Sequence, residues 1–356
     1  MQSSTFDLRL EKFAYGGDAL GRLADGRAAF VPFALPGETV RARSVEEKRG
    51  HVRAELIEVL EPSPERIPPK CQHFGTCGGC HYQHMPYAAQ LRAKEAILRD
   101  QLVRIGHIEN PPVRPIVPSP LEWNYRNHVQ FHLTAEGKLG FVDLTPAPSP
   151  RRRGERNIIP ISECHLPEPA LNALWPQLEF EPGSSLERVS LRLGVDEEVM
   201  LILESESPPV MEIEAGISVV HLNEDDAVVI AGNDHIFIRV KDRDFKVSAG
   251  SFFQVNTAIA KKMVEHLLTC IPVSLSTTLL DVYCGVGLFS AFLASHIGRL
   301  IGIESSPSAC EDFAANLDEF ENVELYEAPA EDVLPVLGHA PTSFWLTRRA
   351  PASSAA

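Results

Sequence analysis

Four cysteines constrain this chain more than any other feature of its sequence. Cys71, Cys77 and Cys80 lie in one short stretch, and Cys164 follows far downstream. Thiolates this close together repel one another unless a metal centre neutralises their charge. The two glycines between Cys77 and Cys80 would let the backbone wrap closely around such a centre. The pattern therefore predicts a metal-centred loop that is tied to a distant part of the chain.

The spacing of these cysteines bears on which metal they hold. Structural zinc sites usually pair two Cys-x-x-Cys knuckles, and this chain has one, Cys77–Cys80. Three clustered ligands with one distant ligand are closer to iron–sulfur ligation, and a zinc-structured binding module remains the alternative. The other cysteines are expected to be buried small residues rather than nucleophiles: Cys270, Cys284 and Cys310.

Composition and charge place the chain among globular proteins without a membrane span. Its 356 residues, 44% of them hydrophobic, predict two or three domains with real cores. With no long apolar run and no signal-peptide core, the chain is expected to be cytoplasmic, with reduced cysteines. The net charge of −15 opposes nucleic-acid binding, but residues 61–160 carry 13 basic against 9 acidic side chains. The arginine run Arg151–Arg153 in this basic half is either a phosphate contact or a solvated loop.

The pattern along the chain predicts a multi-domain protein of β and α/β parts. Residues 1–60 read as about five short strands separated by glycine turns, which is typical of a small barrel of the oligonucleotide-binding type. Residues 61–255 form a central α+β domain with the cysteine site. It contains a helix over Tyr87–Gly106 whose apolar side is formed by Leu91, Ile97, Leu98, Leu102 and Ile105.

Strands and helices alternate from residue 256 to about 340. Strands are expected at Thr278–Tyr283, Leu300–Glu304 and Val323–Tyr326, and helices at Thr257–Leu268, Leu288–Ile297 and Pro307–Leu317. This alternation indicates a parallel sheet with right-handed crossovers, as in Rossmann-like domains.

The first of these strands ends in a glycine turn, Asp281-Val282-Tyr283-Cys284-Gly285-Val286-Gly287. Such a turn lets backbone approach a ligand over the carboxyl ends of the strands, and Glu304 at the end of the next strand is placed to accept hydrogen bonds from ribose hydroxyls. The third glycine of the dinucleotide fingerprint is absent, which favours S-adenosylmethionine over a pyrophosphate-containing cofactor. A Rossmann oxidoreductase and a ligand-free turn are the alternatives.

Several motifs together resemble the S-adenosylmethionine-dependent RNA uracil-C5 methyltransferases, in particular their iron–sulfur branch that acts on ribosomal RNA. The motifs span residues 5 to 338. They are Gly16–Arg22 with Leu35–Glu38, the cysteine loop with Ile161–Leu166, Tyr125–Asn127, Ser251–Asn256 and the glycine turn.

The resemblance implies an RNA-binding TRAM domain at residues 1–60 and a [4Fe–4S] cluster on the four cysteines. It also implies a cofactor site for S-adenosylmethionine made of Gln254, Tyr283, Gly285, Gly287, Leu288 and Glu304. Leu288 stands where the family commonly has asparagine, and the chain is apolar near Ala328–Ala330, where the family places a polar residue. The expected partner is RNA, 23S ribosomal RNA first and transfer RNA as the alternative. No obligate protein partner is indicated, and a monomer is expected.

The resemblance also implies covalent catalysis, in which a cysteine adds to C6 of the uracil and a glutamate later removes the C5 proton. By this comparison, both residues belong to a part of the family sequence beyond Ala356, so no catalytic residue is assigned. Residues 341–356 look aberrant, since Thr347–Ser353 matches a shifted reading of codons for Asp-Pro-Pro-Arg-Ala-Gly-Leu. We therefore expect a frameshifted or truncated chain with an incomplete Rossmann-like domain and little or no methyl transfer. A non-catalytic RNA-binding iron–sulfur protein is the alternative.

Overall fold

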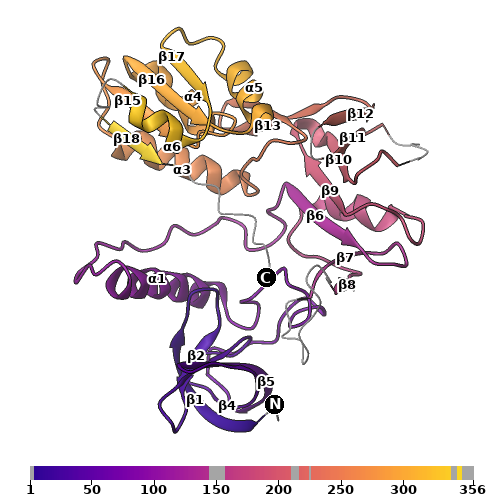
Figure 1. The fold of residues 1–356 in the computed structure, drawn as a ribbon, viewed down its shortest axis with the longest axis vertical. Coiled ribbons are helices and arrows are strands. Elements are labelled where there is room, and N and C mark those ends of the chain that lie inside the picture. Colours follow the sequence, from indigo (N-terminus) through magenta and orange to yellow (C-terminus); the bar gives the residue numbers. More distant parts are fainter. Residues whose placement is uncertain (1–3, 144–156, 210–215, 224–225, 338–342, 347–356) are drawn as a thin grey trace. The chain divides into compact units, whose positions relative to one another are not determined.

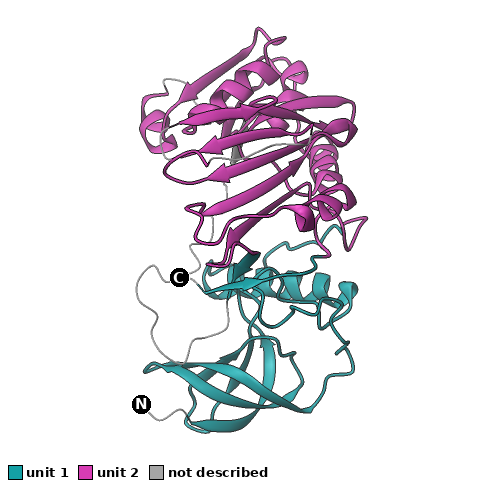
Figure 2. Ribbon diagram, turned by 90° about the vertical axis from the view of Figure 1, so that its right-hand side faces the viewer, with its two compact units in different colours: residues 1–118, 139–164 teal, residues 119–138, 165–356 magenta. Residues whose placement is uncertain are grey.

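The computed structural model describes residues 4–143, 157–209, 216–223, 226–337 and 343–346, coloured along the chain in Figure 1. Two compact units are present (Figure 2): residues 1–118 with 139–164, and residues 119–138 with 165–356. The predicted central domain at 61–255 is divided between them. The arginine run Arg151–Arg153 and the tail from Thr347 lie outside the described residues.

A closed five-stranded barrel opens the first unit. Its strands, in the order β1-β2-β3-β5-β4, are β1 (Thr5–Phe13), β2 (Ala19–Arg22), β3 (Ala28–Val31), β5 (His51–Glu61) and β4 (Thr39–Glu47). Alternate residues point inward, and most of them are small, such as Ala19, Ala29 and Ala42. Small side chains suit the narrow interior of a five-stranded barrel. The predicted barrel is therefore confirmed.

Glu38 fastens the barrel to the proline-rich segment that follows it. Its carboxylate is fully buried and accepts two hydrogen bonds from the Arg66 guanidinium, at 2.5 and 2.7 Å, and two from the backbone amides of Leu35 and Ser63. Burial alone would raise the pKa of Glu38, but these hydrogen bonds lower it below its usual value. The residues after β5 are thus held against the barrel wall.

Helix α1 (Tyr87–Arg104) forms where it was predicted, but only three of the five residues on its predicted apolar side are even half-buried. Leu98 and Ile105 are 51% and 68% exposed, whereas the buried residues are Ala89 and Ala93. These two alanines pack with Leu35 and Met85 in a small separate core. Small residues let the helix approach its neighbours closely, so the buried side follows the alanines rather than the larger aliphatic residues.

A pH-dependent stability is expected from His84, which is 1% exposed. Burial, with the nearby Arg66 charge, lowers the pKa of His84 from 6.5 to about 4. Between these two values the unfolded chain binds a proton that the folded chain does not. The free energy of unfolding therefore falls as pH drops from about 6.5 to 4, by on the order of 3 kcal/mol.

Urea denaturation at several pH values measures this effect. The His84→Gln variant keeps a donor for the Ala34 carbonyl oxygen, which lies 3.4 Å from His84 Nε2, but has no titratable ring. Its unfolding free energy should depend less steeply on pH over this window. Parallel curves for the two proteins would show that His84 is not responsible.

The first unit also contains the cysteine loop and the hairpin of β7 (Leu139–Val142) and β8 (Ile158–Pro160). In the second unit, strands run in the order β12-β11-β10-β9-β6. Their bounds are β12 (Ala227–Ala231), β11 (Ser218–Leu222), β10 (Val199–Glu204), β9 (Arg188–Leu193) and β6 (His128–Leu133). Helix α2 (Pro169–Leu174) and the hairpin of β13 (His235–Val240) and β14 (Arg243–Ser248) complete this part.

A parallel sheet ordered β17-β16-β15-β18 follows (Figure 1). The alternating pattern predicted the first three of these strands, whereas β18 lies in the segment 341–356 that was expected to be an aberrant tail. Its strands are β15 (Thr278–Val282), β16 (Arg299–Glu304), β17 (Val323–Glu327) and β18 (Ser343–Leu346), and its helices are α3 (Thr257–Cys270), α4 (Leu288–Leu293), α5 (Pro307–Asn316) and α6 (Ala330–Val333). One face packs on α3, α4 and α5 and the other on α6. No helix among the described residues is long and apolar enough to cross a membrane.

Candidate functional site

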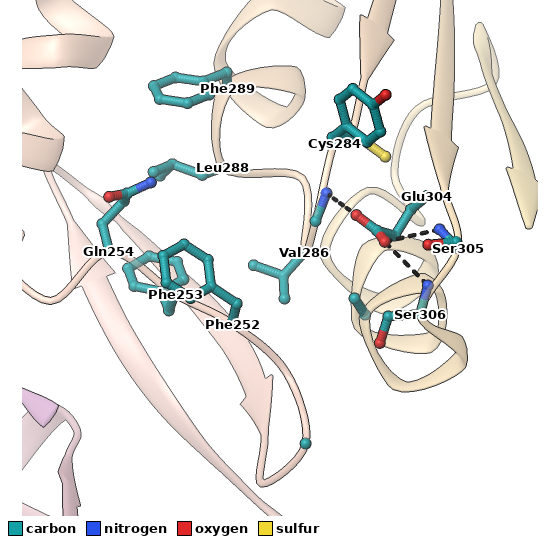
Figure 3. Close-up of a pocket in the computed structure, with 14 residues that line it drawn as sticks. Phe252, Phe253, Gln254, Cys284, Val286, Leu288, Phe289, Glu304, Ser305 and Ser306 are labelled. Carbon is teal, nitrogen blue, oxygen red and sulfur yellow. Dashed lines mark hydrogen bonds between the residues drawn. The ribbon is translucent and has the colours of Figure 1, made fainter. Parts of the chain in front are cut away.

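A cavity of about 530 Å³ lies over the carboxyl ends of β15 and β16 in the second unit (Figure 3). Three segments enclose it: the turn after β15, the start of α5, and the irregular segment before α3. Its lining residues are Gly250, Phe252, Phe253, Gln254, Tyr283, Cys284, Gly285, Val286, Leu288, Phe289, Glu304, Ser305, Ser306 and Ala309. This edge of a parallel sheet is where open α/β folds bind their ligands.

The turn between β15 and α4 has a backbone that few residue types adopt. Tyr283, Gly285 and Gly287 have φ values of 65°, 55° and 85°. Nothing lies within 4 Å of a Cβ built on Gly285, so the backbone there is open to a ligand. A tyrosine at positive φ is strained, and such strain is typical of binding and catalytic sites. The buried Asp281 steadies the turn by accepting a hydrogen bond of 2.6 Å from Ser290 Oγ on α4.

The carboxylate of Glu304 is held by three backbone amides, drawn as dashed lines in Figure 3. Gly285 N donates to Oε2 at 3.0 Å, and Ser305 N and Ser306 N donate to Oε1 at 2.7 and 3.0 Å. The acid therefore joins the glycine turn to the start of α5. Each carboxylate oxygen can accept more than one hydrogen bond, so Glu304 retains acceptor capacity toward the cavity.

Gly287 was predicted to contact the cofactor, but it does not line the cavity. A Cβ on Gly287 would lie 2.4 Å from Leu317 Cδ1 and 3.0 Å from Phe313 Cδ2. This glycine therefore lets α4 pack closely against the residues of α5 and the loop that follows it.

Replacing Gly287 by alanine should lower the free energy of unfolding by about 2–3 kcal/mol, because a clash adds to the strain of positive φ. Urea denaturation tests this. Gly183→Ala is the matched control, since Gly183 also has positive φ (74°) but nothing within 4 Å of a Cβ. An equal loss in the two variants would mean that backbone strain, and not packing, accounts for the whole effect.

The opposite wall comes from the irregular segment between β14 and α3. Phe253 is 5% exposed and packs in the core, whereas Phe252 is 41% exposed. In Figure 3, Gln254 and Glu304 lie on opposite sides of Val286. The cavity thus has an amide at one end and a fixed carboxylate at the other, with apolar residues between them.

Cys284 lines the cavity but is not a nucleophile in this arrangement. Its side chain is 7% exposed, and a Cβ built on Gly302 of β16 would lie 3.0 Å from its Sγ. Burial, with the charges of Asp281 and Glu304, raises the pKa of Cys284 well above its usual value, so the thiol stays protonated.

Five of the six residues predicted for the cofactor line this cavity: Gln254, Tyr283, Gly285, Leu288 and Glu304. Gly250, Phe289, Ser305, Ser306 and Ala309 also line the cavity and were not predicted. For the last three, an acid followed by Ser-Ser-Pro at a helix start is a usable signal. Leu288 is 6% exposed, so an apolar side chain occupies the position of the family's asparagine. Ala328 and Ala330 do not line the cavity, and the Ala328 amide donates to the Glu304 carbonyl oxygen at 2.9 Å.

The four cysteines predicted to hold a metal all belong to the first unit, are half-buried, and form no disulfide. Gln83 Oε1 accepts a hydrogen bond from the Cys71 amide at 3.0 Å. Two hydrogen bonds join the segment before Cys164 to the loop at residues 71–80. Gln72 N donates to Glu163 Oε1 at 2.8 Å, and Ser162 N donates to His73 Nε2 at 3.1 Å.

Burial raises the pKa of the Cys71 thiol above its usual value. Burial, with Cys80 and Cys71 nearby, raises the pKa of Cys77 to about 11. Within the part of the chain that the structure describes, no three His, Cys, Asp or Glu side chains form a group that could hold a metal ion. The predicted cluster on the four cysteines therefore remains a prediction.

Family models match two parts of this chain. A TRAM-domain model matches residues 1–57, the closed barrel, and a model described as tRNA (Uracil-5-)-methyltransferase matches residues 215–339, which include the cavity. An uncharacterised RNA methyltransferase of Thermosynechococcus vestitus is 30% identical over 94% of this chain and 80% of its own length. Another, from Aquifex aeolicus, is 32% identical over 93% of this chain and 79% of its own.

Among solved structures, the fold is similar to the tRNA (uracil-54, C5)-methyltransferase of Pyrococcus abyssi in complex with S-adenosyl-L-homocysteine. The TM-score is 0.64 and the sequence identity 23%, over 90% of this chain and 79% of that one. At this level of identity the likeness concerns the fold.

Proposed function

We propose that this chain, which belongs to the family of S-adenosylmethionine-dependent RNA uracil-5-methyltransferases, holds the methyl donor in the cavity between Gln254 and Glu304 and presents it to C5 of a uridine in RNA. The observation that carries the proposal is the Glu304 carboxylate, fixed by three backbone amides at the mouth of a glycine turn. The similar Pyrococcus abyssi enzyme has S-adenosyl-L-homocysteine bound, which supports an adenosyl ligand here.

The chemistry of the lining residues gives each a role. Glu304 accepts hydrogen bonds from the ribose hydroxyls, and Gly285 leaves room for the ligand to approach the backbone. Gln254 offers one amide donor pair and one acceptor to the amino-acid end of the donor. Val286 and Phe252 provide apolar surface between these two polar ends. When bound, the sulfonium supplies an electrophilic methyl group, and these residues fix its position.

Methyl transfer by the mechanism that the resemblance implies also needs a cysteine thiolate that adds to C6 of the uracil. The sequence has seven cysteines, all of them described, and four of these belong to the predicted cluster. Cys284 and Cys310 are buried as expected, but Cys270, which was also expected to be buried, is exposed at the end of α3 and does not line the cavity. None offers an accessible thiolate beside the donor. We therefore propose that the 356-residue chain binds the methyl donor but transfers its methyl group slowly or not at all.

Two RNA classes are candidates for the substrate. Ribosomal RNA, in particular 23S, follows from the motifs that resemble the iron–sulfur branch. Transfer RNA is supported by the description of the matching family model and by the substrate of the similar Pyrococcus abyssi enzyme. In both cases the TRAM barrel contributes RNA binding.

We also propose a [4Fe–4S] cluster on Cys71, Cys77, Cys80 and Cys164. The donor set fits, because the four thiols belong to one unit and form no disulfide, and the segment carrying Cys164 is hydrogen-bonded to the loop. When bound, the cluster would supply the charge that lets the thiols ionise, and the four cysteines would tie residues 71–80 to residue 164.

Protein purified without oxygen should contain iron and absorb visible light. The Cys164→Ser variant should lose both, while Cys270→Ser, which alters an exposed cysteine outside the set, should keep both. Colourless protein that contains zinc would contradict the cluster and favour the zinc module.

The proposed function is tested by two measurements on one protein sample. Calorimetry with S-adenosylhomocysteine should show binding to the wild-type chain. Transfer of tritiated methyl from S-adenosylmethionine to 23S ribosomal RNA and to transfer RNA should be at or near background. Absence of binding would refute the donor site, whereas robust transfer to either RNA would refute the inactivity and identify the substrate class.

A further inference from the structure

The cavity wall that carries Gln254 has no regular secondary structure. Residues 251–255 lie between β14 and α3 and belong to neither a strand nor a helix, and Asn256 caps the start of α3. A segment of this kind keeps a fixed conformation only if other groups bind its backbone. The question is therefore which side chains fix the carbonyl groups of this wall.

Asn127, which precedes β6, supplies one set of contacts and is 3% exposed. Its Nδ2 donates to the Gln254 carbonyl oxygen and to Thr257 Oγ1, both at 3.0 Å, and its backbone amide donates to the Val255 carbonyl oxygen at 3.0 Å. Its own carbonyl oxygen accepts a hydrogen bond of 2.7 Å from the Leu193 amide. Gln254 is thus held by its main chain, which leaves its side chain to face the cavity.

Arg192, on β9, supplies the other set and is 4% exposed. Its Nη1 donates to the Ser248 carbonyl oxygen and its Nη2 to the Ser251 carbonyl oxygen, both at 2.7 Å. Arg192 pairs in register with His128, the residue after Asn127. The two side chains therefore come from adjacent positions of one rigid sheet and hold the two ends of the wall.

We propose that Asn127 and Arg192 are positioning residues for the methyl-donor site, through which the sheet that contains β6 and β9 sets the affinity for the donor. Neither residue lines the cavity, and both act on the main chain that carries Phe252 and Gln254. The expected change in affinity rests on the proposed function. The hydrogen bonds that position the wall are present in the ligand-free protein and do not depend on it.

Asn127→Asp keeps the shape of the side chain and removes both Nδ2 donors. In ligand-free protein, amide hydrogen exchange of residues 251–257 should become roughly tenfold faster in this variant. The dissociation constant for S-adenosylhomocysteine should rise about tenfold. Asn172→Asp is the matched control: Asn172 Nδ2 also donates to a carbonyl oxygen, that of Pro167, at 2.9 Å in the same unit, outside the cavity. The Asn172→Asp variant should change neither the hydrogen exchange of residues 251–257 nor the dissociation constant.

Asn127→Ser and Arg192→Lys repeat the test without adding a buried carboxylate, in case Asn127→Asp fails to fold. A double-mutant cycle with Gln254→Ala separates positioning from general destabilisation. If Asn127 acts through Gln254, Asn127→Ser should weaken binding little further once Gln254 is alanine.

The outcomes separate the two proposals. Wild-type protein that does not bind S-adenosylhomocysteine refutes the proposed function and leaves hydrogen exchange to decide the positioning. Unchanged exchange of residues 251–257 in Asn127→Ser and Arg192→Lys overturns the positioning, whatever the wild-type affinity. Equal weakening by Asn127→Ser in the wild-type and Gln254→Ala backgrounds overturns the route through Gln254.

Discussion

Replacing Glu304 by alanine is expected to weaken S-adenosylhomocysteine binding by about a hundredfold or more. Two hydrogen bonds from ribose hydroxyls to a carboxylate would be lost, each worth roughly 1.5–3 kcal/mol. The amides of Gly285, Ser305 and Ser306 would also lose the acceptor that joins the glycine turn to α5. Calorimetric titration of the variant measures the loss.

Glu327→Ala is the matched control for this experiment. Glu327 ends β17 and pairs in register with Glu304, carries the same charge, and is exposed outside the cavity. Its replacement should change the dissociation constant less than twofold or so, because an exposed charge is well screened. Similar losses in the two variants would mean that only the negative potential of this sheet edge matters, which would contradict the assigned role of Glu304.

Replacing Asp312 by alanine is expected to lower the free energy of unfolding by about 3–5 kcal/mol. This carboxylate on α5 has no exposed surface and accepts hydrogen bonds from Ser248 N, Ser248 Oγ and Ser251 Oγ at 2.7, 2.6 and 2.5 Å. Lys246 Nζ lies 3.7 Å away. Loss of the Asp312 carboxylate would leave these buried polar groups without their acceptor, which costs far more free energy than the loss of an exposed ion pair.

Urea denaturation measures the effect, with Glu324→Ala as the control. Glu324 pairs with Arg299 at 2.8 Å, but both side chains are well exposed, so its loss should cost about 1 kcal/mol or less. If Asp312→Ala lowers the free energy of unfolding no more than Glu324→Ala does, the network between α5 and the end of β14 does not stabilise the unit.

The elements of the parallel sheet were predictable because their signal is local. Strand β15 is a run of apolar residues closed by glycines, and β16 ends in an acid, so the sequence alone places Tyr283, Gly285 and Glu304 at one edge. Gly287 belongs to the same motif but serves packing. Its role is set by Leu317 and Phe313, which come from a later part of the chain.

The features that escaped prediction depend on contacts between distant residues. The buried side of α1 is set by Leu35 and Met85, so Ala89 and Ala93 are buried where the helical period favoured larger residues. The support of Gln254 by Asn127 joins positions 127 residues apart in the chain. No short motif encodes such a pairing, although Tyr125–Asn127 and Ser251–Asn256 were each recognised separately by resemblance.

A crystal structure of the chain with S-adenosylhomocysteine tests most directly whether an adenosyl ligand lies between Glu304 and Gln254. The predicted result is a ligand over the carboxyl ends of β15 and β16, with both ribose hydroxyls hydrogen-bonded to the Glu304 carboxylate. A ligand bound elsewhere, or one in this cavity whose ribose makes no contact with Glu304, would contradict the account.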